Sequence, residues 1–475
     1  MALPDGPKAP SVWQMLQWIG TPFSFMQSCH RQYGDCFTIQ LNRKFGPLVF
    51  FSQPEALQVI LTNDDAKLFE SPGTLNVALE MITGTQSVFG LSGDRHRRAR
   101  QLLMPPFHGE RMRSYGELIR EIAEQVMREY GTARPFEARE PMQRISLRII
   151  LRAVFGLTDG PRYQELERLI GRLLDGLSNP LNASLLFIPA LRQDLGPLSP
   201  WGRFIRNRQQ IDDLIYQEIA DRRRNQPVSK PHAASEPEPV PASRNDILTL
   251  LMSARDEAGE ALSDAELRDE LMTLLIAGHE TTATALTWAL YWIHLLPPVR
   301  QRLLEELESL DDNSDPNTVF RLPYLNAVCS ETLRIHPVAL LTFGRVTRSR
   351  IELAGVTLDP GTTVTGCIYL AHRRKEVFSK PEEFNPDRFL DRHYSPYEFL
   401  PFGGGVRRCI GMAFAQFEMK LVLSTVLSRF DLALSGTREV RQRRRGLVSG
   451  PSPFKIVKIG ARGGVSAGGR VGVSA

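Results

Sequence analysis

A single cysteine closes a glycine-rich loop near the C-terminal end of this chain, directly before a segment of helical pattern. Residues 402–411 read FGGGVRRCIG, which places the cysteine at position 409. The thiolate form of cysteine binds metal, and Arg407, Arg408 and the start of the following helix supply positive charge that favours this form. The glycines lack side chains, so the backbone has room to lie against a flat and bulky group.

A lone cysteine restricts the kind of metal centre that the chain can build. A zinc site needs about four protein or water ligands, which one cysteine does not provide. A haem iron needs only an axial ligand from the protein, because the porphyrin nitrogens complete its coordination. Two other interpretations are a buried structural cysteine and a phosphate-binding loop. The phosphate loop fails, because Arg408 stands where a dinucleotide-binding fingerprint has glycine and no Gly-Lys-Ser/Thr ending follows.

The pattern Phe-x-x-Gly-x-Arg-x-Cys-x-Gly resembles the cytochrome P-450 family of haem-thiolate monooxygenases. Its positions are filled here by Phe402, Gly405, Arg407, Cys409 and Gly411. The resemblance implies haem b as the cofactor, with Cys409 as the axial ligand of its iron. It also implies that Arg407 pairs with a haem propionate and that Phe402 packs beside the sulfur.

A long helix is expected between residues 263 and 297. Ser263 and Glu266 have the spacing of a capping box, which predicts the start of the helix, and Pro297 and Pro298 predict its end. Some thirty residues at a rise of 1.5 Å span roughly 45–50 Å, which is enough to cross a whole domain.

The middle of this helix, residues 277–282 with the sequence AGHETT, breaks the rules of helix composition. Glycine and β-branched threonines are unfavourable in a helix interior, and such violations suggest a functional site. One alternative is a slightly bent core helix. A metalloprotease HExxH site is excluded, because Ala283 stands where the second histidine is needed. The segment resembles the family's Ala-Gly-x-Asp/Glu-Thr-Thr motif, which implies that the helix opens over the haem, that Thr281 orients dioxygen, and that Glu280 belongs to a proton relay.

Glu331 and Arg334 lie three residues apart, on one face of a predicted helix. On their own they indicate a surface ion pair worth about 1 kcal/mol or less. The segment 384–389, FNPDRF, follows at the distance that the family shows. The resemblance therefore implies a buried triad of Glu331, Arg334 and Arg388 that holds the cysteine loop in place.

Three further basic residues are candidates for contacts to the haem propionates. The segment 96–100, HRRAR, resembles the family helix that contacts them, which implies His96 and Arg100, and Arg345 is the usual third contact. A guanidinium suits a carboxylate better than an ammonium does, because its planar fork binds both oxygens. Taken singly, each residue is better interpreted as a solvated charge; together they would give the two propionates their counter-ions.

A basic rim on the cysteine side is a further hypothesis. It would consist of Arg95, Arg97, Arg98 and Arg408, where an acidic redox partner would dock under the attraction of opposite charge. A merely solvated face is the alternative. The arginine run at 443–445 is interpreted as a solvated turn.

The resemblance implies a mainly α fold with a small β region, in which the haem lies between the long central helix and the cysteine loop. Length alone suggests about three domains, but the resemblance covers most of the chain and implies one domain over residues 1–459. Within it we predict a helix at 22–34, paired strands at 36–41 and 48–51, helices at 115–130 and 145–155, and a flexible loop at about 225–245. Residues 460–475 are expected to be a disordered tail.

Composition excludes several classes of partner and location. A net charge of +5 is too mild to indicate nucleic acid. Five scattered cysteines without a spacing framework indicate a reducing, cytoplasmic location. Neither a signal peptide nor an apolar run of about 18 residues is present, so no transmembrane anchor is expected. The segment 184–189, SLLFIP, either belongs to the core or rests on a membrane as a peripheral contact.

We expect a monomeric monooxygenase that acts on a small lipophilic substrate and takes electrons for O2 activation from a separate ferredoxin or flavodoxin with its reductase. Residues 103–112 resemble a branch, common in cyanobacteria, that is associated with fatty acids, alkanes and terpenoids. The expected substrate wall is apolar and consists of Leu75, Val77, Leu79, Met81, Ile82, Leu185, Leu186, Phe187, Ile188, Val338, Ala339 and Leu340. A peroxide-driven haem peroxygenase of the same fold and a non-catalytic haem-binding sensor are the alternatives.

Overall fold

The computed structural model describes residues 3–42, 46–64, 66–107, 111–157, 159–178, 185, 192–225, 246–311, 314–436, 439–446 and 448–462. The predicted loop at 225–245, apart from Asn225, and the predicted tail from residue 463 onward lie outside this set. The last strand ends at Ala461, two residues beyond the predicted end of the domain at 459.

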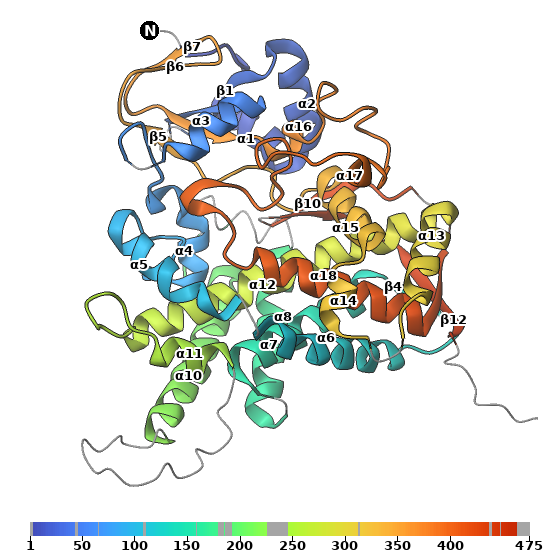
Figure 1. Ribbon diagram of the computed structural model, residues 1–475. Coiled ribbons are helices and arrows are strands. Elements are labelled where there is room, and N and C mark those ends of the chain that lie inside the picture. The colour runs from blue at the N-terminus through green and yellow to red at the C-terminus, as the bar shows by residue number, and fades with distance from the viewer. Residues whose placement is uncertain are drawn as a thin grey trace, which may run out of the picture.

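Helices form most of the described structure, and a strand-rich region lies at the top of Figure 1 above a larger helical body. The α-helices are α1 (Ser11–Gly20), α2 (Pro22–Tyr33), α3 (Pro54–Thr62), α4 (Val77–Thr83), α5 (Gly93–Leu103), α6 (Arg111–Arg128), α7 (Arg139–Phe155), α8 (Pro161–Ser178), α10 (Pro200–Asn225), α11 (Ile247–Ser253), α12 (Asp264–Leu295), α13 (Pro297–Glu308), α14 (Pro316–Phe320), α15 (Pro323–Ile335), α16 (Ile368–Ala371), α17 (Arg388–Asp391) and α18 (Met412–Arg429). Short 3₁₀ turns are η1 (Gly73–Asn76), η2 (Pro105–Phe107) and η5 (Gly405–Arg407).

The strands form small sheets around this body. They are β1 (Cys36–Asn42), β2 (Gly46–Phe51), β3 (Phe69–Glu70), β4 (Phe136–Glu137), β5 (Arg345–Thr347), β6 (Ile351–Leu353), β7 (Val356–Leu358), β8 (Thr363–Gly366), β9 (Phe430–Ser435), β10 (Gln442–Arg445), β11 (Val448–Pro451) and β12 (Lys455–Ala461). The largest sheet has the order β1-β2-β8-β5-β3, and β4-β12-β9 form a second one. The predicted pairing of the first two strands is confirmed, because β1 runs antiparallel to β2 with Cys36 opposite Phe51.

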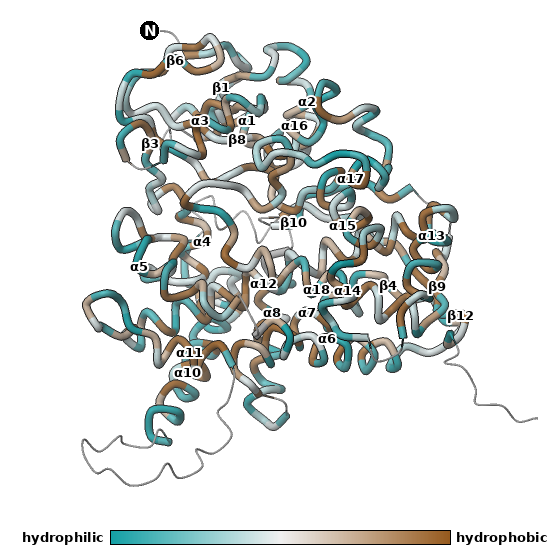
Figure 2. The backbone as a smooth tube through the Cα atoms, in the orientation of Figure 1, coloured by the Kyte–Doolittle hydropathy of each residue, from teal (hydrophilic) through white to brown (hydrophobic). Residues whose placement is uncertain are grey.

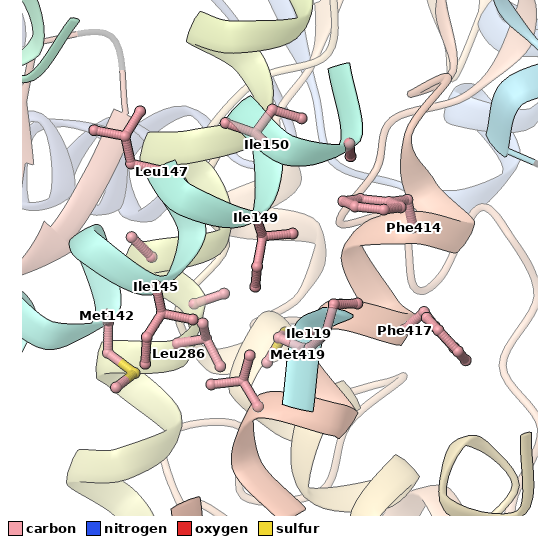
Figure 3. Packing of buried hydrophobic residues seen from close by; sticks show 14 of the residues in the cluster. Ile119, Met142, Ile145, Leu147, Ile149, Ile150, Leu286, Phe414, Phe417 and Met419 are labelled. Carbon is pink, nitrogen blue, oxygen red and sulfur yellow. The ribbon is translucent and has the colours of Figure 1, made fainter. Parts of the chain in front are cut away.

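The helix α12 crosses the middle of the molecule and packs against α7 and α18 (Figure 1). Its capping box is present, since Ser263 Oγ accepts from the Glu266 amide and the Glu266 side chain accepts from the Ser263 amide. Ile149 of α7, Leu286 of α12 and Met419 of α18 meet in the buried core between these helices (Figure 3). This packing fixes α12 in place, and α12 carries the AGHETT segment.

A glycine lets α7 approach α12 closely. A Cβ at Gly278 would lie 2.9 Å from Cδ1 of Ile150, which is closer than side chains normally come. The unfavourable helix propensity of Gly278 is therefore explained by packing as well as by its place in the motif.

Two surface predictions have different outcomes. The prediction of a solvated turn at 443–445 is wrong: these residues lie in β10, where Arg444 donates to the Trp18 carbonyl at 3.1 Å and lies over the Trp18 ring. The prediction for 184–189 stays open, because only the buried Leu185 of this segment is described. Among the described residues, no helix is both long and apolar enough to cross a bilayer.

Candidate active site

A cavity separates α12 from the cysteine loop. On the α12 side it is lined by Thr273, Leu274, Ala277, Gly278, Thr281, Thr282 and Ala285. On the opposite side it is lined by Phe402, Gly403, Gly404, Arg407, Arg408, Cys409, Ile410 and Gly411. Further lining comes from Val88, Phe89, His96, Arg100, Val338, Ala339, Phe343 and Val448. The segments that carry the two predicted motifs thus face each other across one cavity.

Cys409 lies on the wall of this cavity, and its side chain is accessible from it. Its amide donates to the carbonyl of Phe402 at 3.0 Å, which closes the loop on itself. Burial raises the pKa of the Cys409 thiol, while the Gly411 amide and the guanidinium groups of Arg100 and Arg408 lower it. The protein alone therefore favours a thiol, and a bound metal cation would replace its proton.

Gly405 gives the loop its shape. Its φ is +66°, a left-handed conformation that favours glycine, and a Cβ there would lie 2.4 Å from Asp64 Oδ2. The same carboxylate oxygen accepts from the Val406 amide at 3.0 Å and from Arg345 Nη2 at 2.8 Å. Asp64 therefore anchors the loop, although nothing in the sequence around it indicated such a role.

Positive charge gathers at one edge of the otherwise apolar cavity. Burial and the neighbouring charges of Arg345 and Arg100 lower the pKa of Arg407 to about 10, against the opposing effect of Asp64. Burial lowers the pKa of His96 to about 3, together with the guanidinium charges of Arg407, Arg100 and Arg345. Of these guanidinium groups, Arg345 and Arg407 interact with the one carboxylate of Asp64, whereas the charge partners of Arg100 are Cys409 and Arg408. A ligand with carboxylate groups would relieve the repulsion among the three guanidinium groups. A haem, with two propionates at one edge and an iron for Cys409, fits this set of residues.

The predicted propionate contacts lie at different depths. His96 and Arg100, on the strongly hydrophilic helix α5 (Figure 2), both line the cavity. Arg407 lines it too, but its guanidinium already donates to Ser71, Val88 and Leu91. Arg345 is completely buried behind the wall and is directed toward Asp64.

The two residues predicted for dioxygen and proton handling are separated. Thr281 lines the cavity, and its hydroxyl donates to the Ala277 carbonyl at 2.6 Å. The carboxylate of Glu280 instead accepts hydrogen bonds from Arg139 and, at 3.4 Å, from Gln143 of α7. The helix is continuous here, so the opening expected from the resemblance is not seen.

The structure brings Glu331, Arg334 and Arg388 together in the interior. Arg334 Nε and Nη2 donate to the two carboxylate oxygens of Glu331 at 2.6 and 2.8 Å, and Arg388 Nε donates at 3.1 Å. Glu331 and Arg334 are completely buried. Arg334 also donates to the carbonyls of His372 and Pro381 at 2.9 and 2.8 Å, so the triad holds several chain segments at once.

Two predictions about surfaces around the site are wrong in part. Arg98 does not belong to a free basic rim, because its guanidinium pairs with Asp256 and Glu266.

Of the expected substrate wall, Val338 and Ala339 line the cavity. Residues that are described but do not line it are Leu75, Val77, Leu79, Met81, Ile82, Leu185 and Leu340, and Leu186, Phe187 and Ile188 lie outside the described residues. The aromatic pair Phe89 and Phe343, with ring centroids 5.8 Å apart, is there instead.

Comparison with known proteins gives consistent matches. The family model "Cytochrome P450" matches residues 4–457. Cytochrome P450 135B1 of Mycobacterium tuberculosis is 34% identical over 467 residues, which cover 98% of this chain and 93% of the relative. Cytochrome P450 138 of Mycobacterium bovis is 32% identical over 449 residues, which cover 94% of each chain. The structure of retinoic acid-bound cyanobacterial CYP120A1 has a TM-score of 0.81 at 22% identity and covers 97% of this chain and 100% of that chain.

The family match spans nearly the whole chain, and the structural likeness gives the same mainly α architecture with small sheets. The family's cofactor is haem, and the cavity offers a lone cysteine on one wall and unbalanced positive charge at its edge. The chain therefore belongs to the cytochrome P450 family and is a haem-thiolate monooxygenase.

Proposed function

We propose that this monooxygenase inserts one oxygen atom from O2 into a lipophilic substrate of the fatty acid, alkane or terpenoid class. The observation that carries this proposal is the apolar wall above Cys409, where Phe89, Phe343 and Val338 meet the α12 segment around Ala277. A cavity with such a wall and few polar groups suits an apolar ligand. Bound haem supplies the iron at which dioxygen is activated.

The structural neighbour supports the terpenoid part of this class. That cyanobacterial protein was solved with bound retinoic acid, which is an isoprenoid carboxylic acid. In this protein the rings of Phe89 and Phe343 form an apolar surface for an elongated ligand. The hydroxyl groups of Thr273 and Thr342, which also line the cavity, carry no charge. We therefore propose that the substrate carries a long isoprenoid or fatty acyl chain and is not a compact polar compound.

The proposed roles of the site residues follow from their positions. Cys409 is the axial ligand, and Phe402 packs beside its sulfur. Thr281 faces the cavity and positions dioxygen and a water. Glu280 delivers protons, which requires its carboxylate to leave Arg139 at some stage of the cycle.

The haem propionates are proposed to lie at the cationic edge of the cavity. We assign them to His96, Arg100 and Arg407, with Arg345 as the contribution from behind the wall. The triad of Glu331, Arg334 and Arg388 is structural. Gly405 and Gly411 are assigned to the backbone conformation of the cysteine loop.

We further propose a monomer with one catalytic domain, placed in the cytoplasm and reduced by a separate ferredoxin or flavodoxin system. The five cysteines are all free, which supports a reducing compartment. Arg95, Arg97 and Arg408 remain exposed on the cysteine side and are the proposed docking residues for an acidic partner, although Arg97 already contacts Asp94.

A panel of fatty acids, alkanes and isoprenoid acids, added to the haem-loaded protein, tests the substrate class. Binding that displaces the iron-bound water is expected to shift the absorbance from the low-spin to the high-spin form. Turnover with a ferredoxin system should then yield a hydroxylated product detected by mass spectrometry. A response only to small polar compounds contradicts the proposal, and product formed with peroxide but not with any reductase system favours the peroxygenase alternative.

A further inference from the structure

We propose that His372 is a positioning residue for Cys409, a role that rests on the proposed ligation of iron by this cysteine. Its imidazole fixes the amide of Leu400, and through it the segment that accepts the Cys409 amide. The residue directly follows α16 and does not itself line the cavity, although Ile368, at the start of that helix, does. No motif in the sequence pointed to it.

The tautomer of His372 is determined by its two partners. The Leu400 amide donates to Nε2 at 2.9 Å, so this nitrogen is the unprotonated one, because a backbone N–H acts only as a donor. Nδ1 lies 3.2 Å from the carbonyl oxygen of Arg334 and must therefore carry the proton. The side chain is completely buried. A protonated imidazole would lose the bond to Leu400, so the neutral ring is the functional form.

A short path leads from this ring to the sulfur. The carbonyl of Leu400 accepts from the Gly403 amide at 3.0 Å, so both polar groups of Leu400 are bonded. Pro401 follows and stiffens the chain, because its ring fixes φ. Phe402 then accepts the hydrogen bond from the Cys409 amide at 3.0 Å. A shift at Leu400 therefore moves the acceptor that holds Cys409.

The same ring joins the buried triad to the cysteine loop. The backbone carbonyl of His372 accepts from Arg334 Nη1 at 2.9 Å, while its ring bonds the Arg334 carbonyl. Arg334 in turn donates to both oxygens of Glu331. The imidazole also packs on Phe399, with ring centroids 5.4 Å apart. The triad thus acts on the cysteine loop through His372.

Two polar substitutions separate the two hydrogen bonds of the ring. In His372→Gln the amide oxygen reaches the position of Nε2 and accepts from Leu400. In His372→Asn the shorter amide reaches only the position of Nδ1 and leaves the Leu400 amide without a partner. His372→Leu removes both bonds. If His372→Leu does not fold, the Gln and Asn pair still decides the question.

The first readout is the absorbance of the reduced carbon monoxide complex, which distinguishes a thiolate-ligated from a thiol-ligated iron. We expect His372→Gln to keep the thiolate-type band. We expect His372→Asn and His372→Leu to raise the ratio of the thiol form to the thiolate form roughly tenfold, as for the loss of one buried hydrogen bond. The second readout is amide hydrogen exchange in the haem-loaded protein. Exchange should become faster at Leu400 and Cys409 in His372→Asn and His372→Leu but not in His372→Gln.

A half-buried histidine elsewhere provides the control. His294 of α12 has its Nδ1 bonded to the Leu290 carbonyl at 2.8 Å within its own helix. His294→Leu should lower stability without changing the thiolate band or the exchange of Leu400. The inference is overturned if His372→Gln loses the thiolate band to the same extent as His372→Leu. It is also overturned if His372→Leu keeps both the thiolate band and slow amide exchange at Leu400 and Cys409. A wild-type protein without the thiolate band would instead overturn the proposed function.

Discussion

Glu280 and Thr281 are neighbours in the chain but face different parts of the protein. Thr281 lines the cavity opposite Cys409, whereas the Glu280 carboxylate is held by Arg139 of α7. Successive residues on a helix point about 100° apart, because the helix has 3.6 residues per turn. A single motif therefore supplies one group to the cavity wall and one to the interface between α12 and α7, and the two need separate tests.

Thr281→Ala should bind haem and substrate but consume reductant without forming the matching amount of product. Without the hydroxyl, the water that delivers protons loses its partner at the cavity, so reductant is consumed with release of hydrogen peroxide. The measurement is the ratio of product formed to reductant consumed, which should fall about tenfold or more. Thr287→Ala is the matched control, because Thr287 makes the same bond to its own helix at 2.6 Å but does not line the cavity. Normal coupling in Thr281→Ala would remove this residue from the mechanism.

Glu280→Gln should slow product formation by about tenfold or more, as for loss of a group that transfers protons. Arg139→Gln, which frees the carboxylate from its partner, should keep more of the activity than Glu280→Gln does. Turnover rates in ordinary and deuterated water provide the measurement. If Glu280→Gln matches the wild-type rate and isotope effect, the residue serves only to hold α12 against α7.

Glu331→Gln should destabilise the protein by about 3–5 kcal/mol, because it leaves buried guanidinium groups without their counter-charge. Denaturant unfolding of the haem-loaded protein measures this free energy. Asp387→Asn is the control, since Asp387 pairs with Arg302 at 2.5 Å on the surface, where each side chain is about half exposed. It should cost about 1 kcal/mol or less. Equal effects of the two substitutions would show that the triad does not support the fold.

Glu418 should make stability depend on pH. Burial raises the pKa of this carboxyl to about 8 from 4.5, and a hydrogen bond from Ser146 only partly offsets that effect. Between these values the folded state holds a proton that the unfolded state has lost, so its stabilising effect is complete below pH 4.5 and is lost as the pH rises toward 8. The loss is on the order of 4–5 kcal/mol. Glu418→Gln should flatten the unfolding free energy over this range, and an unchanged slope would contradict the assignment.

The parts of the fold that the sequence predicted are those with local signals. The capping box of Ser263 and Glu266 and the prolines after Leu295 defined α12 to within a residue or two, because caps and breakers act over one turn. The paired strands at 36–41 and 48–51 followed from β-branched and aromatic residues around a turn.

The parts that could not be predicted depend on contacts between distant segments. Asp64 lies some 340 residues before the loop that it anchors, and its neighbours in sequence carry no pattern. Arg444 appeared to be a surface charge, because nothing local shows that Trp18 lies beneath it. The pairing of Glu280 with Arg139 likewise required the packing of α7 on α12.

The most direct measurement of the central claim is the absorbance spectrum of the dithionite-reduced, haem-loaded protein with carbon monoxide, compared with that of Cys409→Ala. We expect a Soret band of the thiolate-ligated type in the wild type and its complete absence in Cys409→Ala. A wild-type spectrum without this band, or a Cys409→Ala spectrum that retains it, would show that the sulfur of Cys409 does not bind the iron.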